Sequence, residues 1–147
     1  MHMKVFFKMH NLMASLAKSL HFALVEKCDM SFPQFMFLTS VQNHPDKSQR
    51  MLASFRKMTP AAISKQVDSL IDKGWVVKKI KKGKRLEYAL SLSSVGKKKL
   101  KQAEKILEKH YKKILGDRVD KETLIVEKKI DDWLKLLNTE EKDICSI

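Results

Sequence analysis

The sequence predicts a mainly α-helical fold that contains one small β-hairpin. Apolar residues recur at helical spacing toward both ends of the chain, and two helix-start signals stand near its middle. A lysine-rich turn then separates two short runs that are rich in strand-forming residues. A chain of 147 residues is long enough to bury a core, so we expect residues 1–147 to form a single domain.

The first two helices are predicted from apolar spacing and from one capping signal. From about Val5 to Glu26, the apolar positions recur four and three apart, at Met9, Met13, Leu16, Leu20 and Ala23. Ser31 is a suitable N-cap for a second helix, and Pro33 falls in its first turn, where a missing N–H does little harm. We expect one side of this second helix to carry Phe35, Leu38, Thr39 and Gln42, with Phe37 and Val41 on its flank.

A short helix and a capped helix follow. The short one is predicted from Ser48 or Gln49 to about Lys57, with inward-facing Met51, Leu52, Phe55 and Met58. Thr59 followed by Pro60 is a strong start signal for the next helix, which Gly74 would end. Its expected buried stripe is Ile63, Val67, Leu70 and Ile71.

The hairpin and two long helices complete the chain. One strand is expected over Trp75–Ile80, and a second over Leu86–Leu92, where apolar and small or polar residues alternate. Lys81–Arg85, which includes Gly83, would form the connecting turn. Ser93 or Ser94 would begin a helix that runs to about Leu115, and a last helix is expected from about Asp120 to Leu137.

Positive charge is concentrated around this hairpin. The chain carries a net charge of +13, and between Trp75 and Lys101 ten basic residues stand against one acid, Glu87. Such a field attracts polyanions, although lysine-rich faces are often only solvated.

A short helix, a capped helix and a basic hairpin, in that order, are typical of a winged helix-turn-helix that binds duplex DNA. The capped helix carries small and polar side chains off its buried stripe, as insertion into the major groove requires.

Ser64 and Gln66 are candidate base readers, and Lys65 would reach a guanine edge or a phosphate. At the wing tip, Arg85 is the candidate for minor-groove insertion. The full set of candidate DNA-binding residues is Thr59, Pro60, Ala61, Ser64, Lys65, Gln66, Ser69, Lys81, Lys82, Lys84 and Arg85. An ordinary amphipathic surface helix would show the same pattern.

From Phe35 to about Leu107 the chain resembles the MarR family of transcriptional regulators. The resemblance rests on Leu52–Ala53, Thr59–Leu70, Lys73–Val76 and Leu92–Gly96. It implies a homodimer that binds a pseudo-palindromic operator, most simply as a repressor. Residues 31–96 would form the DNA-binding lobe, and residues 4–27 and 94–138 a helical dimerisation layer. Where the family wing carries an acid and an arginine, this chain has Lys84 and Leu86.

The resemblance also implies a place for regulators other than DNA. Family members bind small-molecule effectors between the two layers, so an effector of unknown identity is a candidate partner. Phe22, Phe32, Phe35 and Phe37 would line its site, or would serve only as core. Some members of the family sense peroxides through a cysteine in the N-terminal region, and Cys28 is the candidate here. Lys27 beside it would favour the thiolate. An ordinary half-buried cysteine fits the same pattern.

Other classes of function find little support in the sequence. No phosphate-binding glycine loop, nucleophile elbow or ligand-spaced Cys/His cluster is present, so we expect no enzyme activity, no cofactor and no metal site. No apolar run is long enough to span a membrane, and cysteine is scarce, so we expect a cytoplasmic protein. Two alternatives to a regulator stay open: a non-specific architectural or RNA-associated basic protein, and a protein-interaction module whose lysines only improve solubility.

Overall fold

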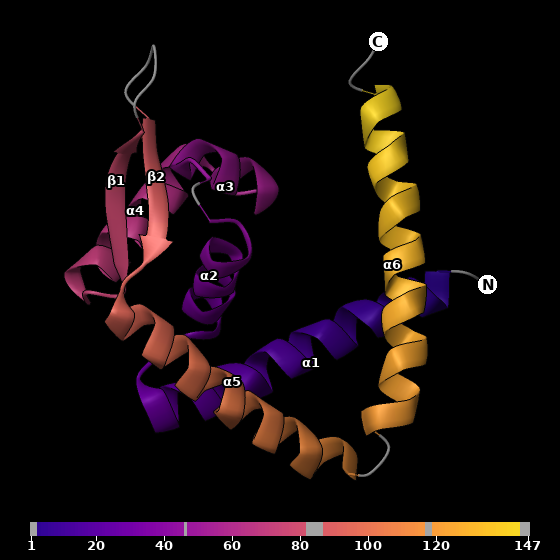
Figure 1. Ribbon diagram of the computed structural model, residues 1–147. Coiled ribbons are helices and arrows are strands. Elements are labelled where there is room, and N and C mark those ends of the chain that lie inside the picture. Colours follow the sequence, from indigo (N-terminus) through magenta and orange to yellow (C-terminus); the bar gives the residue numbers. More distant parts are fainter. Residues whose placement is uncertain (1–2, 46, 82–86, 117–118, 145–147) are drawn as a thin grey trace. The chain divides into compact units, whose positions relative to one another are not determined.

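The computed structural model describes residues 3–45, 47–81, 87–116 and 119–144 (Figure 1). The chain divides into two compact units, residues 1–107 and 108–147, and each is described by itself. The elements, in order, are α1 (Met3–Cys28), α2 (Phe32–Asn43), α3 (Gln49–Phe55), α4 (Pro60–Asp72), β1 (Val76–Lys81), β2 (Glu87–Leu92), α5 (Ser94–Leu115) and α6 (Val119–Ile144). This is the predicted order, so a mainly α fold with one antiparallel hairpin is confirmed.

Side-chain caps explain where the central helices begin. The Ser31 hydroxyl accepts a hydrogen bond from the Gln34 N–H at 3.2 Å, and the Gln34 side chain accepts one from the Ser31 N–H at 2.9 Å. These reciprocal bonds form a capping box at the start of α2. Thr59 caps α4 in a similar way, because its hydroxyl accepts from the Ala62 N–H at 3.2 Å. Each cap satisfies a donor that the helix itself leaves without a partner.

The end of α4 is as well defined as its start. Gly74 has a positive φ of 69°, and its N–H donates to the Ile71 carbonyl at 2.8 Å. The Trp75 N–H reaches the Leu70 carbonyl at 2.9 Å. Together these two bonds form a Schellman motif, which needs a left-handed residue at the position of Gly74. The chain therefore leaves α4 and enters β1 within a few residues.

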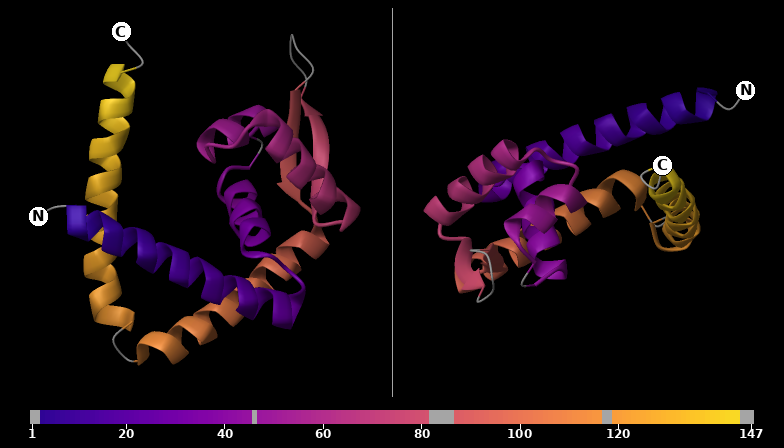
Figure 2. Two further views of the ribbon diagram at one scale, coloured as in Figure 1. Left: turned by 180° about the vertical axis from the view of Figure 1, so that it is seen from behind. Right: turned by 90° about the horizontal axis from the view of Figure 1, so that it is seen from above.

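The hairpin lies beside α4 and contains a pairing that the sequence did not reveal (Figure 2). β1 and β2 pair in register from Val76 opposite Leu92 to Lys81 opposite Glu87. On the other edge of β2, Ser48 forms an isolated antiparallel bridge with Ala89. The two-stranded hairpin is therefore extended by one residue, and β2 is flanked on both edges at Ala89.

This placement corrects the predicted alternation along β2. Leu90 and Leu92 are buried as expected, but Ala89, which was expected to face solvent, is only 5% exposed. Chain segments flank Ala89 on both sides, and its small side chain offers little surface. Tyr88 was expected to be covered and is instead exposed, because it lies toward the tip and beyond the core.

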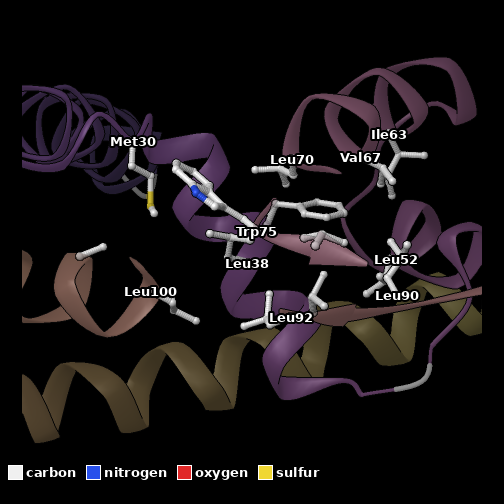
Figure 3. Close-up of a cluster of buried hydrophobic side chains, with 14 of the residues drawn as sticks. Met30, Leu38, Leu52, Ile63, Val67, Leu70, Trp75, Leu90, Leu92 and Leu100 are labelled. Carbon is white, nitrogen blue, oxygen red and sulfur yellow. The ribbon is translucent and has the colours of Figure 1, made fainter. Parts of the chain in front are cut away.

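The core of the first unit joins α1, α2, α3, α4, both strands and the first half of α5 (Figure 3). Its labelled members include Leu38 from α2, Leu52 from α3, Val67 from α4, Leu90 from β2 and Leu100 from α5. All five are at most 1% exposed. The stripe predicted for α4 is confirmed, with Ile71 partly buried at its margin.

Two predicted faces are correct only in part. In α2 the buried residues are Phe37, Leu38, Ser40 and Val41, whereas Gln42 is exposed and Phe35 is only partly buried. Because α2 packs against α1 on one side and β2 on another, its buried surface is wider than a single stripe. In α3, Leu52 and Ala53 are buried, but Met51 is 49% exposed.

A tight junction joins the end of α4, the start of β1 and the start of α5. The Ser93 N–H donates to the Trp75 carbonyl at 3.0 Å, and the Ser93 hydroxyl donates to the Gly74 carbonyl at 2.6 Å. The same hydroxyl accepts from the Gly96 N–H at 2.9 Å, so Ser93 is also the N-cap of α5. The backbones approach so closely that a Cβ at Gly96 would lie 1.9 Å from the Trp75 carbonyl oxygen.

We predict that Gly96→Ala destabilises the fold more than Gly74→Ala does. The added methyl at Gly96 meets backbone that cannot rotate away, and we expect a loss of about 3 kcal/mol. At Gly74 nothing lies within 4 Å of the position that a methyl would take, so only the positive φ is strained, at about 1 kcal/mol. Urea unfolding of both variants measures the two losses, and equal losses would contradict the close approach at Gly96.

Candidate nucleic-acid interface

The helix α4 presents an exposed face with small side chains at its start. Its buried stripe of Ile63, Val67 and Leu70 fixes which side faces the core. Other residues of the helix are exposed: Pro60, Ala61, Ala62, Lys65, Asp68, Ser69 and Asp72. No acid occupies its first turn, so the helix dipole favours an anion there, although Pro60 has no N–H and the Ala62 N–H is bonded to the Thr59 hydroxyl. The start of α4 is therefore suited to close approach by a phosphate or a base edge.

Ser64 lies on the side of α4 that faces the hairpin. It is half-buried and lines an open groove of about 820 Å³ bordered by α3, α4 and the two strands. Lys78 from β1 also lines this groove and forms an ion pair with Asp68 at 3.2 Å. One of the two acids exposed on α4 is thereby paired with a lysine of the hairpin.

Gln66 has a structural partner that its position in the sequence did not suggest. Its side-chain amide donates to the Pro33 carbonyl at 3.0 Å, which joins α4 to the first turn of α2. A role for Gln66 in base reading requires that this bond break or that the amide oxygen act alone. Thr59 is likewise occupied, because its hydroxyl caps α4. Lys65 and Ser69 remain exposed, as expected for residues that would contact DNA.

The wing is described only at its base. Lys79 is exposed on β1, and Lys81 is its last residue. Most of the residues singled out at the tip, namely Lys82, Lys84 and Arg85, lie outside the described residues, as does Leu86. The last described pair of the hairpin is Lys81 opposite Glu87.

Two lysines near the hairpin are used inside the fold. The Lys73 ammonium lies 4.7 Å from the centre of the Trp75 ring, and the Lys99 ammonium lies 5.8 Å from it. Lys73 also donates to the Asp29 carbonyl at 3.4 Å, and Lys99 donates to the Cys28 carbonyl at 2.9 Å. Cation–π contacts and bonds to the last carbonyls of α1 therefore tie this helix to the base of the wing.

Cys28 sits at this junction and is buried, with 5% of its surface exposed. Burial raises the pKa of its thiol, and this outweighs the opposite effects of the Lys99 charge and of a hydrogen bond from the Met30 backbone. A raised pKa disfavours the thiolate that peroxide sensing requires. The geometry thus favours the ordinary buried cysteine, and the basic residue that faces Cys28 is Lys99 rather than the adjacent Lys27.

We predict that Cys28 makes stability depend on pH in the alkaline range. Because folding raises the pKa of this thiol, its stabilising contribution is full below the ordinary pKa of a thiol. The contribution falls as pH rises through the higher folded value. Urea unfolding of the wild type and Cys28→Ala from pH 7 to 10 should show a steeper alkaline loss for the wild type. Parallel curves would contradict a buried, protonated thiol.

Within the described part of the chain, no group of three or more His, Cys, Asp or Glu side chains is arranged to hold a metal ion. Among the helices described, none combines the length and apolar character that a membrane crossing demands.

Comparisons with known proteins agree with this geometry. The sequence model of the MarR family matches residues 29–85, which span α2 to the wing. No curated protein sequence matches the chain. Among solved structures, the transcriptional regulator BldR from Sulfolobus solfataricus is 22% identical, with a TM-score of 0.77 and coverage of 94% of this chain and 95% of that one.

Two further structures share the fold. MarR from E. coli in its apo form is 17% identical, with a TM-score of 0.73 and coverage of 86% of this chain and 93% of that one. A MarR-family transcriptional regulator from Rhodococcus sp. RHA1 is 16% identical, with a TM-score of 0.75 and coverage of 93% and 94%. The MarR family model thus matches the winged-helix lobe of this chain, and the chain has the winged helix-turn-helix fold of solved MarR-family structures.

Proposed function

We propose that the protein is a homodimeric, sequence-specific regulator that binds a pseudo-palindromic site in duplex DNA and represses transcription. The observation that carries the proposal is the exposed, small-residue start of α4 beside a lysine-rich antiparallel hairpin. A helix of this kind fits the major groove, and a basic hairpin beside it is placed to meet the flanking backbone. This makes the chain a binding protein rather than an enzyme.

The two elements have different tasks in this proposal. Ala61 allows the α4 backbone to approach the base edges, and Ser64, Lys65 and Ser69 lie near enough to that approach to read them. The wing-tip residues Lys81, Lys82, Lys84 and Arg85 supply phosphate contacts, which raise affinity for any sequence. Sequence choice therefore resides mainly in α4, and affinity mainly in the wing.

We predict that Lys65→Ala and Lys82→Ala weaken binding in different ways. Loss of Lys65 should change the relative affinities for different sequences, by about 1–3 kcal/mol at the base that it reads. Loss of Lys82 should weaken binding to all sequences alike and reduce the salt slope by about 0.9. Fluorescence anisotropy across a salt series measures both effects, and identical profiles for the two variants would contradict the division of tasks.

Selection of bound sequences from a random duplex pool tests the proposal as a whole. Enrichment of a two-fold symmetric motif supports a dimeric regulator. Equal affinity for all duplexes and for structured RNA would support a non-specific basic protein instead. Absence of binding to any polyanion at low salt would favour a protein-interaction module.

The dimer is supported by apolar surface on the terminal helices. On α6, the exposed side chains at helical spacing include Val126, Ile130, Trp133 and Leu137. On the N-terminal half of α1, they include Met3, Phe6, Phe7 and Met13. Apolar stripes of this length need a partner in water, and a second copy supplies identical stripes by two-fold symmetry.

We predict that Ile130→Glu shifts the protein toward the monomer. The change places a charge in the middle of the α6 apolar stripe, where a dimer interface would have to desolvate it. Lys128→Glu also adds negative charge to α6 but lies on the opposite face, so it serves as the matched control. Sedimentation equilibrium should show dissociation for Ile130→Glu alone. A wild type that is monomeric at all concentrations would remove the dimer from the proposal.

A small-molecule effector completes the proposal. Two similar structures were solved with ligands, RdhR-CbdbA1625 with 2,4-dichlorophenol and CouR with p-coumaroyl-CoA. In this chain, Phe32 and Phe35 stack with ring centres 6.2 Å apart and are only partly buried. Phe37, by contrast, is fully buried in the core. The partly buried pair and the exposed Phe22, rather than Phe37, are therefore the aromatic surface available to an effector.

A further inference from the structure

A second groove lies beside the turn between α3 and α4, away from the hairpin. Its volume is about 510 Å³, and it is lined by Met36, Thr39, Ser40, Asn43, His44, Arg56 and Lys57. The first four residues form one face of α2, and Arg56 and Lys57 come from the turn at the end of α3. Arg56 is three residues before Thr59, the cap of α4. The groove therefore opens next to the start of the helix proposed to enter DNA.

Arg56 lacks the partners that a partly buried guanidinium normally has. Its Nε is fully buried and forms no hydrogen bond, and one terminal nitrogen donates to the Met36 carbonyl at a long 3.4 Å. Burial lowers the pKa of the guanidinium, and no carboxylate among the described residues opposes this effect. A desolvated charge without a counterion is costly, so this arrangement is unfavourable for the isolated chain.

The turn that holds Arg56 is tightly defined. The Lys57 N–H donates to the Ser54 carbonyl at 3.0 Å, and the Met58 N–H donates to the Ala53 carbonyl at 2.9 Å. Lys57 adopts a positive φ of 51°, which a lysine tolerates less well than glycine. The two basic residues are thus presented together by a rigid Schellman turn at the rim of the groove.

The other lining groups indicate an anion rather than an apolar ligand. The hydroxyls of Thr39 and Ser40 donate to carbonyls one turn earlier in α2, both at 2.9 Å, so neither offers a proton to a ligand and the donors must come from the other lining residues. The lining side chains that carry N–H groups are Asn43, His44, Arg56 and Lys57. Met36 is the one large apolar side chain that lines the groove. An aromatic or aliphatic acid would find little surface here.

We propose that this groove binds a phosphate group, held by the Arg56 guanidinium with support from Lys57 and Asn43. A guanidinium matches two phosphate oxygens in a forked geometry, and such charge-assisted bonds are strong. The phosphate has two possible sources, the backbone of a duplex bound by α4 and a free phosphate compound. The first source rests on the proposed DNA-binding function, and the second does not.

Arg56→Met tests the site, because methionine replaces the apolar stem of the arginine but not its charge. Arg56→Lys retains the charge without the fork, and Lys18→Met removes an exposed charge on α1 as the matched control. In the first arm, inorganic phosphate is titrated at constant ionic strength, and the shift in Tm is measured. The wild type and Lys18→Met should be stabilised, Arg56→Lys less so, and Arg56→Met not at all.

In the second arm, affinity for a random-sequence duplex is measured across a salt series. Arg56→Met should bind about tenfold more weakly than the wild type, with a salt slope smaller by about 0.9, whereas Lys18→Met should match the wild type. If Arg56→Met changes only the phosphate titration, the natural ligand of the groove is a free phosphate compound. If it changes only duplex binding, the ligand is the DNA backbone. Either supports the site.

The site is overturned if Arg56→Met equals the wild type in both arms. A purely structural arginine would show a different signature, in which Arg56→Met loses stability without phosphate and neither arm depends on the guanidinium. If the wild type binds no duplex, the proposed function fails, and the phosphate titration still decides whether the groove binds phosphate.

Discussion

The fold depends on the close approach of backbone at Gly96 and Trp75. A single hydroxyl, that of Ser93, caps α5 and also binds the Gly74 carbonyl at the end of α4. Helix α4, the wing and helix α5 are therefore fixed to one another at one point. A winged helix that binds DNA must present its helix and wing at the spacing of a groove and its backbone, so this rigidity would serve the proposed function directly. Side chains larger than hydrogen at Gly96 would separate the elements.

The local signals in the sequence predicted the elements well because each signal acts within a few residues. Thr59, Ser31 and Gly74 act through bonds to backbone only three or four positions away. The faces of α2 and α3 were harder to predict, because several elements surround each short helix and the buried surface follows from packing. The bridge between Ser48 and Ala89 joins residues 41 positions apart, and no periodicity in either segment indicates it.

The same limit applies to the candidate site. Spacing alone placed Gln66 off the buried stripe of α4, but its partner, the Pro33 carbonyl, is 33 residues away. Net charge likewise cannot separate lysines that attract DNA from lysines that hold the fold. Lys99 was counted with the basic region, yet it donates to the Cys28 carbonyl and faces the Trp75 ring. Lys99 keeps its charge, but its ammonium group is held inside the fold, so Lys65 and Lys79, both exposed, are the better placed lysines for direct contact with DNA.

Lys73, Lys99 and Arg56 show how differently one fold can treat a partly buried cation. The first two each bind a carbonyl at the end of α1 and lie over an aromatic ring, so their loss of hydration is offset inside the chain. Arg56 has one bond of 3.4 Å, no longer than that of Lys73, but its buried Nε has no partner. A buried charge with unmade hydrogen bonds destabilises the fold more than an apolar side chain of the same size does. If Arg56 served structure alone, methionine would therefore be the more stable residue at this position. An anion in the groove would offset the charge of Arg56, though not the unmade bond of its buried Nε, and this is the physical reason for placing a phosphate there.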